Sequence, residues 1–296
     1  MMRLPPVRIP ISSAEAAAHT SARRANLLQY TVAILIEIRS LAGVSFETMT
    51  EAFNDAFSDY DIPAKYTTEY LTNLVIRRGY RPDLAVGAFD GDRLVGFVFN
   101  CLDGQEAYNS GTGTAISHRR RGIARQLMQR SIETLPAKRY ILEVIDTNTR
   151  AEALYRDLGF VETRRLQCWT FWSAAALPPL LKRQQAAALQ IIRSWYDFAP
   201  AWQNEVASIR RASEPHIVIG DENCGAVVFP SNGDVPLLAA KPSARRRGLG
   251  RALLEVAAAR VGKPLRIMNV EDSVAGFLER CGAEKFVRQI EMVRII

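Results

Sequence analysis

The sequence has few of the residues that hold metals or cross-link small folds. Four cysteines and three histidines occur among 296 residues, and no two cysteines form a C-x-x-C pair. We therefore expect no structural zinc site, no disulfide framework and no metal. Apolar runs are also too short to cross a bilayer, and residues 1–26 lack the apolar core of a signal peptide. These absences predict a protein of the cytoplasm with no membrane partner, although the arginine and serine content of the first residues leaves an organellar address open.

The composition is that of a folded protein with a modest basic excess. Hydrophobic residues make up 48% of the chain, which excludes disorder of its bulk. Lysine and arginine (38) outnumber aspartate and glutamate (31), giving a net charge of +7. This excess favours an anionic ligand such as a polyphosphate cofactor. The arginines cluster at two predicted helix starts, and no helix-turn-helix or RNA-binding aromatic signature is present, so we expect no nucleic-acid partner.

An internal repeat divides the chain. Arg119–Met128 and Arg245–Leu254 share six of ten residues, and in both copies apolar residues then follow a helical period. Further along, Leu154–Phe160 corresponds to Phe277–Ala283. The repeat predicts two related domains in tandem.

The domain boundaries follow from this repeat and from prolines. We expect a poorly ordered extension over 1–35, a first domain over 36–174, a helical joint over 175–189 and a shorter second domain over 190–296. In the first domain we expect strands near 33–42, 84–90, 93–102, 107–117, 140–146 and 162–172, and helices near 45–58, 64–79, 123–138 and 149–158. Asp90-Gly91-Asp92 predicts a hairpin turn between the strands over 84–90 and 93–102. In the second domain we expect a long helical segment over 180–212, strands near 216–220, 225–230, 236–240 and 265–270, helices after 248 and near 273–281, and a last strand.

The Arg/Gly segment has the features of an anion site. A strand that enters a helix through small residues leaves the first helical amides unpaired, at the positive end of the helix dipole. Gly122 and Ala124 allow a phosphate to approach the backbone, and Arg120, Arg121 and Arg125 can add charge-assisted contacts. The alternative is an ordinary helix start with surface arginines. Two copies in the same context favour a phosphate site in at least one half.

Two motifs carry a resemblance to a family. Arg119-x-x-Gly122-x-Ala124 resembles the pyrophosphate loop of the GCN5-related N-acetyltransferases (GNAT). The run from Asn148 through Leu154-Tyr155 to Gly159-Phe160 is similar to the family's second signature. The resemblance implies an α/β fold of two tandem GNAT-like domains, each a central twisted mixed β-sheet flanked by helices, with the second domain abridged.

The resemblance also implies a reaction and its residues. The expected cofactor is acetyl-CoA, used as a co-substrate, and the acceptor is a primary amine of a small molecule or peptide. Backbone groups of Thr112, Gly113 and Thr114 would hold the pantetheine arm. The pyrophosphate would be held by Arg119, Arg120, Arg121, Gly122, Ile123, Ala124 and Arg125. Asn148 would contact the cofactor, and Tyr155 would donate a proton to the departing thiolate.

The sequence identifies the base that deprotonates the amine less specifically than it identifies the cofactor loop. Some family members place a base at the strand position occupied here by Glu143, whereas a strand glutamate facing solvent is the alternative. For Tyr155 the alternative is a core tyrosine, because Ala151, Leu154 and Leu158 form an apolar stripe with it. Tyr60, Asp61, Tyr108 and Asn109 lie where the family builds its acceptor pocket, and His118 is explained as well by capping a helix start.

The two halves differ in what they retain. The second half has Leu278 in place of Tyr155 and Glu271 in place of Asn148, and a carboxylate is a poor neighbour for a polyanion. We therefore expect direct acetyl transfer in a ternary complex in the first half. An active site in the second half and a non-catalytic CoA-binding or regulatory module remain alternatives, and the chain could be a monomer or a homodimer.

Overall fold

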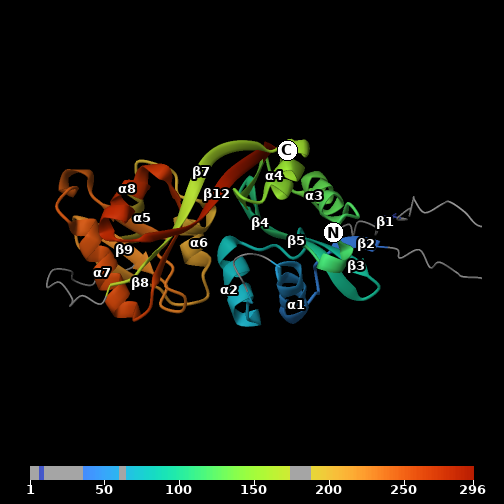
Figure 1. Cartoon of the computed structure of the whole chain (residues 1–296), viewed down its shortest axis with the longest axis horizontal. Coiled ribbons are helices and arrows are strands. Elements are labelled where there is room, and N and C mark those ends of the chain that lie inside the picture. Colours follow the sequence, from blue (N-terminus) through green and yellow to red (C-terminus); the bar gives the residue numbers. More distant parts are fainter. Residues whose placement is uncertain (1–6, 10–35, 60–64, 174–187) are drawn as a thin grey trace, which may run out of the picture. The chain divides into compact units, whose positions relative to one another are not determined.

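The computed structural model describes residues 7–9, 36–59, 65–173 and 188–296 (Figure 1). They group into two compact units. Unit 1 takes its residues from 1–68, 81–100 and 111–135, and unit 2 takes its residues from 69–80, 101–110 and 136–296. Strands β4 (Arg93–Asp103) and β5 (Glu106–Thr114) pass from one unit into the other.

Unit 1 is a β-sheet flanked by helices. Besides its parts of β4 and β5, its described elements are β1 (Val7–Ile9), β2 (Ile36–Ser40), α1 (Phe46–Ala56), β3 (Val86–Asp90), η1 (Ile116–His118) and α3 (Ile123–Thr134). The strand order is β1-β2-β3-β4-β5. Asp90 pairs with Arg93, so the chain reverses at Gly91 as the sequence predicted.

Two glycines allow close packing in unit 1. A Cβ at Gly96 on β4 would lie 2.9 Å from Cγ2 of Ile123, the first residue of α3. A Cβ at Gly113 on β5 would lie 2.4 Å from Cζ of Phe97. Any other residue at either position would force the neighbouring side chains to shift, so these glycines set how α3 and β5 lie against β4.

Unit 2 contains the rest of the first repeat and the whole described part of the second. Its elements are α2 (Thr68–Arg78), β6 (Arg139–Ile145), α4 (Thr149–Asp157), β7 (Val161–Phe171), α5 (Ala188–Ser194), η2 (Trp202–Asn204), α6 (Val206–Arg211), β8 (Ile217–Gly220), β9 (Cys224–Val228), β10 (Leu237–Ala240), η3 (Pro242–Ala244), α7 (Leu249–Val261), β11 (Leu265–Glu271), α8 (Asp272–Cys281) and β12 (Glu284–Ile295). The strand orders are β5-β6-β12-β7-β11 and β10-β9-β8. The fold is thus a mixed sheet flanked by helices, as expected.

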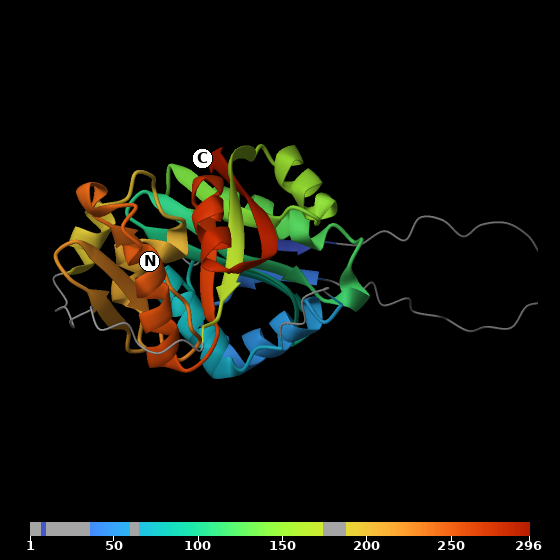
Figure 2. The same cartoon turned by 60° about the vertical axis from the view of Figure 1, so that its left-hand side comes forward.

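The last strands of the two repeats are exchanged within unit 2. Strand β12, from the second repeat, pairs antiparallel with β6 and with β7, which both belong to the first repeat. Strand β7 in turn pairs with β11 of the second repeat. The long strands β7 and β12 lie side by side in both views (Figures 1 and 2). This exchange joins the repeats in one sheet, which the repeat in the sequence did not predict.

Most predicted elements match observed ones to within a few residues. The main difference is in the segment over 180–212, whose described part forms two short helices and η2 instead of a long helix. Within the extension over 1–35, Val7–Ile9 pairs with β2. The rest of that extension, Tyr60, Asp61 and most of the joint over 175–189 lie outside the described residues. The predicted domain boundaries therefore stay predictions.

Candidate functional site

The Arg/Gly loop lies in unit 1, between η1 and α3. Arg120 and Gly122 both adopt left-handed backbone angles, with φ of 63° and 75°. Gly122 is the N-cap of α3, and no side chain caps this helix. Around the position that a Gly122 Cβ would take, the nearest heavy atom is Nε2 of Gln126 at 3.7 Å. A bare helix start of this kind fits the diphosphate that the resemblance implies.

The side chain of Arg119 is bonded inside the protein, unlike those of the next two arginines in the loop. Its Nη1 and Nη2 donate to the two oxygens of Asp59 at 2.6 and 2.8 Å, and Nη2 also donates to the carbonyl of Ala56 at 2.7 Å. The bonds from Arg119 hold the pKa of Asp59 below its usual range. The Arg119 side chain thus fixes the loop to the end of α1, whereas Arg120 and Arg121 are exposed.

His118 secures the same loop from the other side. Its buried ring lies 2.9 Å from the hydroxyl of Ser117 and 3.2 Å from a carboxylate oxygen of Asp90. His118 therefore has a structural role in the turn before the loop.

The strand before the loop offers one orphaned polar atom. The hydroxyl of Thr114 is buried and has no hydrogen-bond partner among the described residues, and buried hydroxyls usually have one. Thr112 lies close to Met128 on α3, with Oγ1 3.5 Å from the sulfur. Gly113 is required by packing, so its presence does not by itself indicate a ligand.

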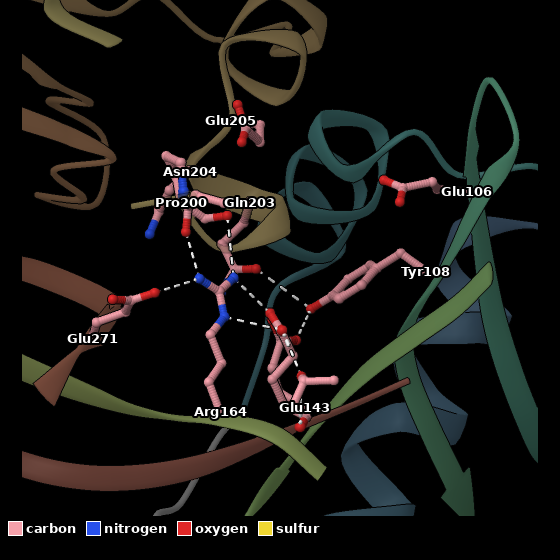
Figure 3. Close-up of polar contacts among 12 residues, drawn as sticks. Glu106, Tyr108, Glu143, Arg164, Pro200, Gln203, Asn204, Glu205 and Glu271 are labelled. Carbon is pink, nitrogen blue, oxygen red and sulfur yellow. Dashed lines mark hydrogen bonds and ion pairs between the residues drawn. The ribbon is translucent and has the colours of Figure 1, made fainter. Parts of the chain in front are cut away.

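Unit 2 contains an acid–base cluster around Glu143 (Figure 3). The parallel pairing of β5 with β6 covers only Glu106–Tyr108 and Arg139–Ile141. Tyr108 stands at the end of this paired stretch, and its hydroxyl donates to Oε2 of Glu143. Oε1 of Glu143 is buried without a fully formed hydrogen bond in the described part of the chain. The structure thus excludes the interpretation of Glu143 as a glutamate facing solvent.

The surroundings set the ionisation of both groups. Burial, which is the largest cause, and Glu291 raise the pKa of Glu143, whereas Tyr108, Arg78 and, most weakly, Asn269 lower it; the resulting pKa is about 7. Burial first and Glu143 second raise the pKa of Tyr108 well above its usual value. At neutral pH Tyr108 therefore stays protonated, whereas Glu143 exchanges a proton readily.

Residues of the second repeat cover this cluster. The indole of Trp202 stacks on the ring of Tyr108 with centroids 5.2 Å apart, and its Nε1 donates to the carbonyl of Arg78 at 2.8 Å. The side-chain oxygen of Gln203, which is buried, lies 3.5 Å from the Tyr108 hydroxyl. The cluster is therefore built from both repeats.

Asn148 and Tyr155 lie on α4, also in unit 2. Asn148 is the N-cap of the helix, and its Oδ1 accepts a hydrogen bond from the backbone N–H of Ala151 at 3.1 Å. Tyr155 is 8% exposed and packs edge-on against Phe160. The structure gives both residues local structural roles, and their predicted roles toward the cofactor stay predictions.

Sequence reasoning missed the part of the cluster that comes from the second repeat. Trp202, Gln203 and Glu291 are far from Glu143 in the sequence, and only the strand exchange and the position of η2 bring them together. Only Glu291 has a sequence signal, and it is weak: Glu291 is the single charged residue in the apolar strand segment Ile290–Val293.

The described residues form neither a metal site nor a membrane span. They contain no group of three or more His, Cys, Asp or Glu side chains placed to hold a metal ion. Within 7–9, 36–59, 65–173 and 188–296, no helix combines the length and apolar character needed to span a membrane.

Comparison with solved structures shows the fold. An inferred acetyltransferase from Pyrococcus horikoshii has a TM-score of 0.67 at 16% identity, with 94% of each chain covered. A GCN5-related N-acetyltransferase from Sphaerobacter thermophilus has 0.66 at 14% identity, covering 88% of this chain and 95% of that one. A tandem GNAT protein from the clavulanic acid biosynthesis pathway has 0.66 at 14% identity, with coverages of 88% and 98%.

Sequence comparison assigns a family to part of the chain. No curated protein matches the chain, but residues 46–160 match the model of the acetyltransferase (GNAT) family. This stretch contains both motifs, with Gly122 in the first and Asn148 and Tyr155 in the second. The chain thus carries a GNAT-family acetyltransferase domain over residues 46–160 within a tandem GNAT fold, as the two motifs predicted.

Proposed function

We propose that the chain is an N-acetyltransferase that moves an acetyl group from acetyl-CoA directly to a primary amine, with Glu143 as the general base. The observation that carries the proposal is the buried Glu143–Tyr108 pair, in which the carboxyl has a pKa of about 7. GNAT proteins in general transfer acetyl groups from acetyl-CoA. The acceptor class, a small molecule or a peptide, and the ternary complex are part of the proposal.

The residues proposed to bind the donor lie on the Arg/Gly loop and on the strand before it. Acetyl-CoA supplies an activated thioester when bound. The left-handed turn at Arg120 and Gly122 and the uncapped start of α3 are suited to its diphosphate. The exposed guanidinium groups of Arg120 and Arg121 add positive charge there, and the orphaned Thr114 hydroxyl is suited to a polar group of the pantetheine arm.

The residues proposed to deprotonate the acceptor belong to the Glu143 cluster. An amine attacks a carbonyl only in its neutral form, so a protonated acceptor must lose a proton first. Oε1 of Glu143 is the atom without a fully formed hydrogen bond, and we assign it the acceptance of that proton. Tyr108 holds Oε2 and keeps the carboxylate in place.

Tyr155 is assigned the proton that the departing thiolate needs. A phenol with a pKa near 10 that protonates a thiolate of pKa about 8.5 works uphill by roughly 2 kcal/mol in unperturbed terms. A positioned hydrogen bond that strengthens as the carbon–sulfur bond breaks can cover this difference. The buried position of Tyr155 limits its exchange with solvent.

The alternatives meet specific obstacles. An active site in the second half has Leu278 in place of a proton donor, and Glu271 is occupied by an ion pair with Arg164 at 2.9 Å. A non-catalytic CoA-binding module would need no buried carboxyl with a raised pKa. The Glu143 cluster therefore favours catalysis in the first half.

A thiol-release assay tests the proposal. The full chain is incubated with acetyl-CoA and a panel of small amines and peptide N-termini, and free CoA thiol is measured between pH 5.5 and 9. We expect kcat/KM to rise with pH through about 7, because only the deprotonated carboxylate of Glu143 accepts a proton. Absence of thiol release with every amine would favour the non-catalytic alternative.

The variant Glu143→Gln assigns the effect to the residue. We expect roughly a hundredfold loss of turnover. The matched control is Glu106→Gln, which alters a glutamate on the neighbouring strand β5 whose partner is the exposed Arg139. Equal losses in the two variants would contradict the role of Glu143.

A further inference from the structure

One row of charged residues crosses three strands of unit 2. Glu291 on β12 stands directly opposite Glu143 on β6 and directly opposite Arg164 on β7. Directly opposed side chains of an antiparallel pair lie on the same face and within reach of one another, and opposed like charges are unfavourable. The row therefore places a second carboxylate beside the proposed base.

Glu291 is itself buried and firmly held. It is 8% exposed, and the guanidinium of Arg164 bonds both of its oxygens, from Nε at 3.0 Å and from Nη2 at 2.7 Å. The hydroxyl of Thr163 donates to Oε1 at 2.9 Å. A bidentate pair of this kind holds the buried carboxylate in one place.

Arg164 also holds the segment that covers Tyr108. It donates to the backbone carbonyls of Ala199 and Pro200, just before η2, and pairs with Glu271 at 2.9 Å (Figure 3). Trp202 and Gln203 follow in η2. Arg164 thus contacts both the neighbour of the base and the chain that carries its cover.

The other groups facing Glu143 come from four further places. Tyr108 on β5 donates to it, and Arg78 on α2 contributes positive charge. On β7, burial raises the pKa of the Cys168 thiol to about 12, so this group is neutral. Asn269 on β11 is uncharged. Glu291 is therefore the one anion among the described groups that are known to act on Glu143.

We propose that Glu291 and Arg164 are positioning residues of the acid–base site, which favour the proton-bound and the ionised form of Glu143, respectively. The proposal rests on Glu143 being the base. It gives the strand exchange a functional consequence, because the second repeat supplies through β12 a charge that the first repeat lacks. Neither residue is assigned contact with substrate.

Two substitutions in the same ion pair should have opposite effects. Glu291→Gln removes the repelling charge and leaves Arg164, so the protonation midpoint of Glu143 should fall by about one pH unit. Arg164→Gln leaves Glu291 and Glu271 without their counter-ion, so the midpoint should rise by about the same amount. Arg164→Lys keeps the charge and should restore a midpoint near that of the wild type.

The measurement is a carbon-13 NMR titration of the side-chain carboxyl of Glu143 in the full chain, assigned with Glu143→Gln. The pH profile of acetyl transfer is recorded in parallel. A purely structural ion pair would lower stability in both variants and move the midpoint in the same direction or leave it unchanged, and either result would overturn the proposal. If Arg164→Gln does not fold, the fall expected in Glu291→Gln and the return to wild type in Arg164→Lys decide the matter.

The NMR readout also separates this proposal from the proposed function. Opposite shifts without acetyl transfer to any amine would leave the charge row established and refute the acetyltransferase assignment. Acetyl transfer that depends on Glu143, with no opposite shifts, would support the acetyltransferase assignment and refute the positioning roles of Glu291 and Arg164.

Discussion

The two Arg/Gly loops of the chain are built alike. In unit 1, the guanidinium of Arg119 bonds Asp59 and the carbonyls of Ala56 and Thr114. In unit 2, the guanidinium of Arg245 bonds Asp197 and the carbonyls of Trp195 and Ala240. The next arginine in each loop has a left-handed φ, 63° at Arg120 and 64° at Arg246.

This likeness shows what the repeated arginine does. The first arginine of each loop fixes the turn from inside, so its repetition reflects the construction of the loop and does not indicate two phosphate sites. The helix starts then differ. A Cβ at Gly250 would lie 2.7 Å from the ring of Phe277, which occupies the space beside the first turn of α7.

The helices that follow differ as well. Asn148 and Glu271 are both N-caps, of α4 and of α8, so the sequence alignment of these two residues holds in the structure. Asn148 caps its helix, whereas the side chain of Glu271 makes no capping bond and pairs with Arg164. The second repeat thus has the same loop backbone as the first, but the side chains around its loop make structural contacts.

The strongest test of this difference replaces the N-cap glycine of each loop with glutamate. Gly122→Glu should weaken CoA binding by roughly a hundredfold or more, because it places a carboxylate at the proposed anion site. Gly248→Glu is the matched control. Its φ is 81° against 75°, so both variants bear a similar backbone strain of about 1–2 kcal/mol. Titration calorimetry with CoA measures the effect, and the reverse pattern would place the cofactor in the second repeat.

Removing the Tyr155 hydroxyl should give the next largest effect. The second repeat has the buried Leu278 at this position. If Tyr155 donates the proton, Tyr155→Phe should lower kcat by about a hundredfold and leave the affinity for acetyl-CoA unchanged. Tyr140→Phe is the control, because Tyr140 also packs against Phe160, with ring centroids 5.5 Å apart. Similar turnover in both variants would identify Tyr155 as a core tyrosine.

The sequence predicted those parts of the molecule that depend on neighbouring residues. The periods of apolar residues predicted the strands and helices, and Asp90-Gly91-Asp92 predicted a hairpin that the pairing of Asp90 with Arg93 confirms. The strand exchange could not be predicted, because either partner of β6 would satisfy the same alternation of apolar residues. Glu143 could be named as a candidate, but its burial depends on β12 and η2.

A third test separates the two roles of Asn148. Asn148→Ala removes the cap and should lower the free energy of unfolding by about 1 kcal/mol. Asn148→Asp retains a capping oxygen and should leave that free energy nearly unchanged, but it adds the charge found at Glu271 in the second repeat. If Asn148 contacts the cofactor, Asn148→Asp should weaken CoA binding by about tenfold. Unchanged affinity would leave Asn148 as a cap alone.

The smallest effect is expected where the two loops are most alike. Asp59 and Asp197 are both exposed, and each has its pKa lowered by the hydrogen bonds from its arginine. Because a carboxyl with a lowered pKa is ionised at neutral pH, each ion pair is complete there and is lost only as the pH falls through the lowered value. Asp59→Asn should therefore raise the dissociation constant of CoA at pH 7 by only about twofold, since an exposed pair contributes little. Asp197→Asn should leave it unchanged. A larger effect from Asp197→Asn would mean that the second loop, and not the first, is held in shape for the cofactor, even if its neighbouring helix has lost the tyrosine.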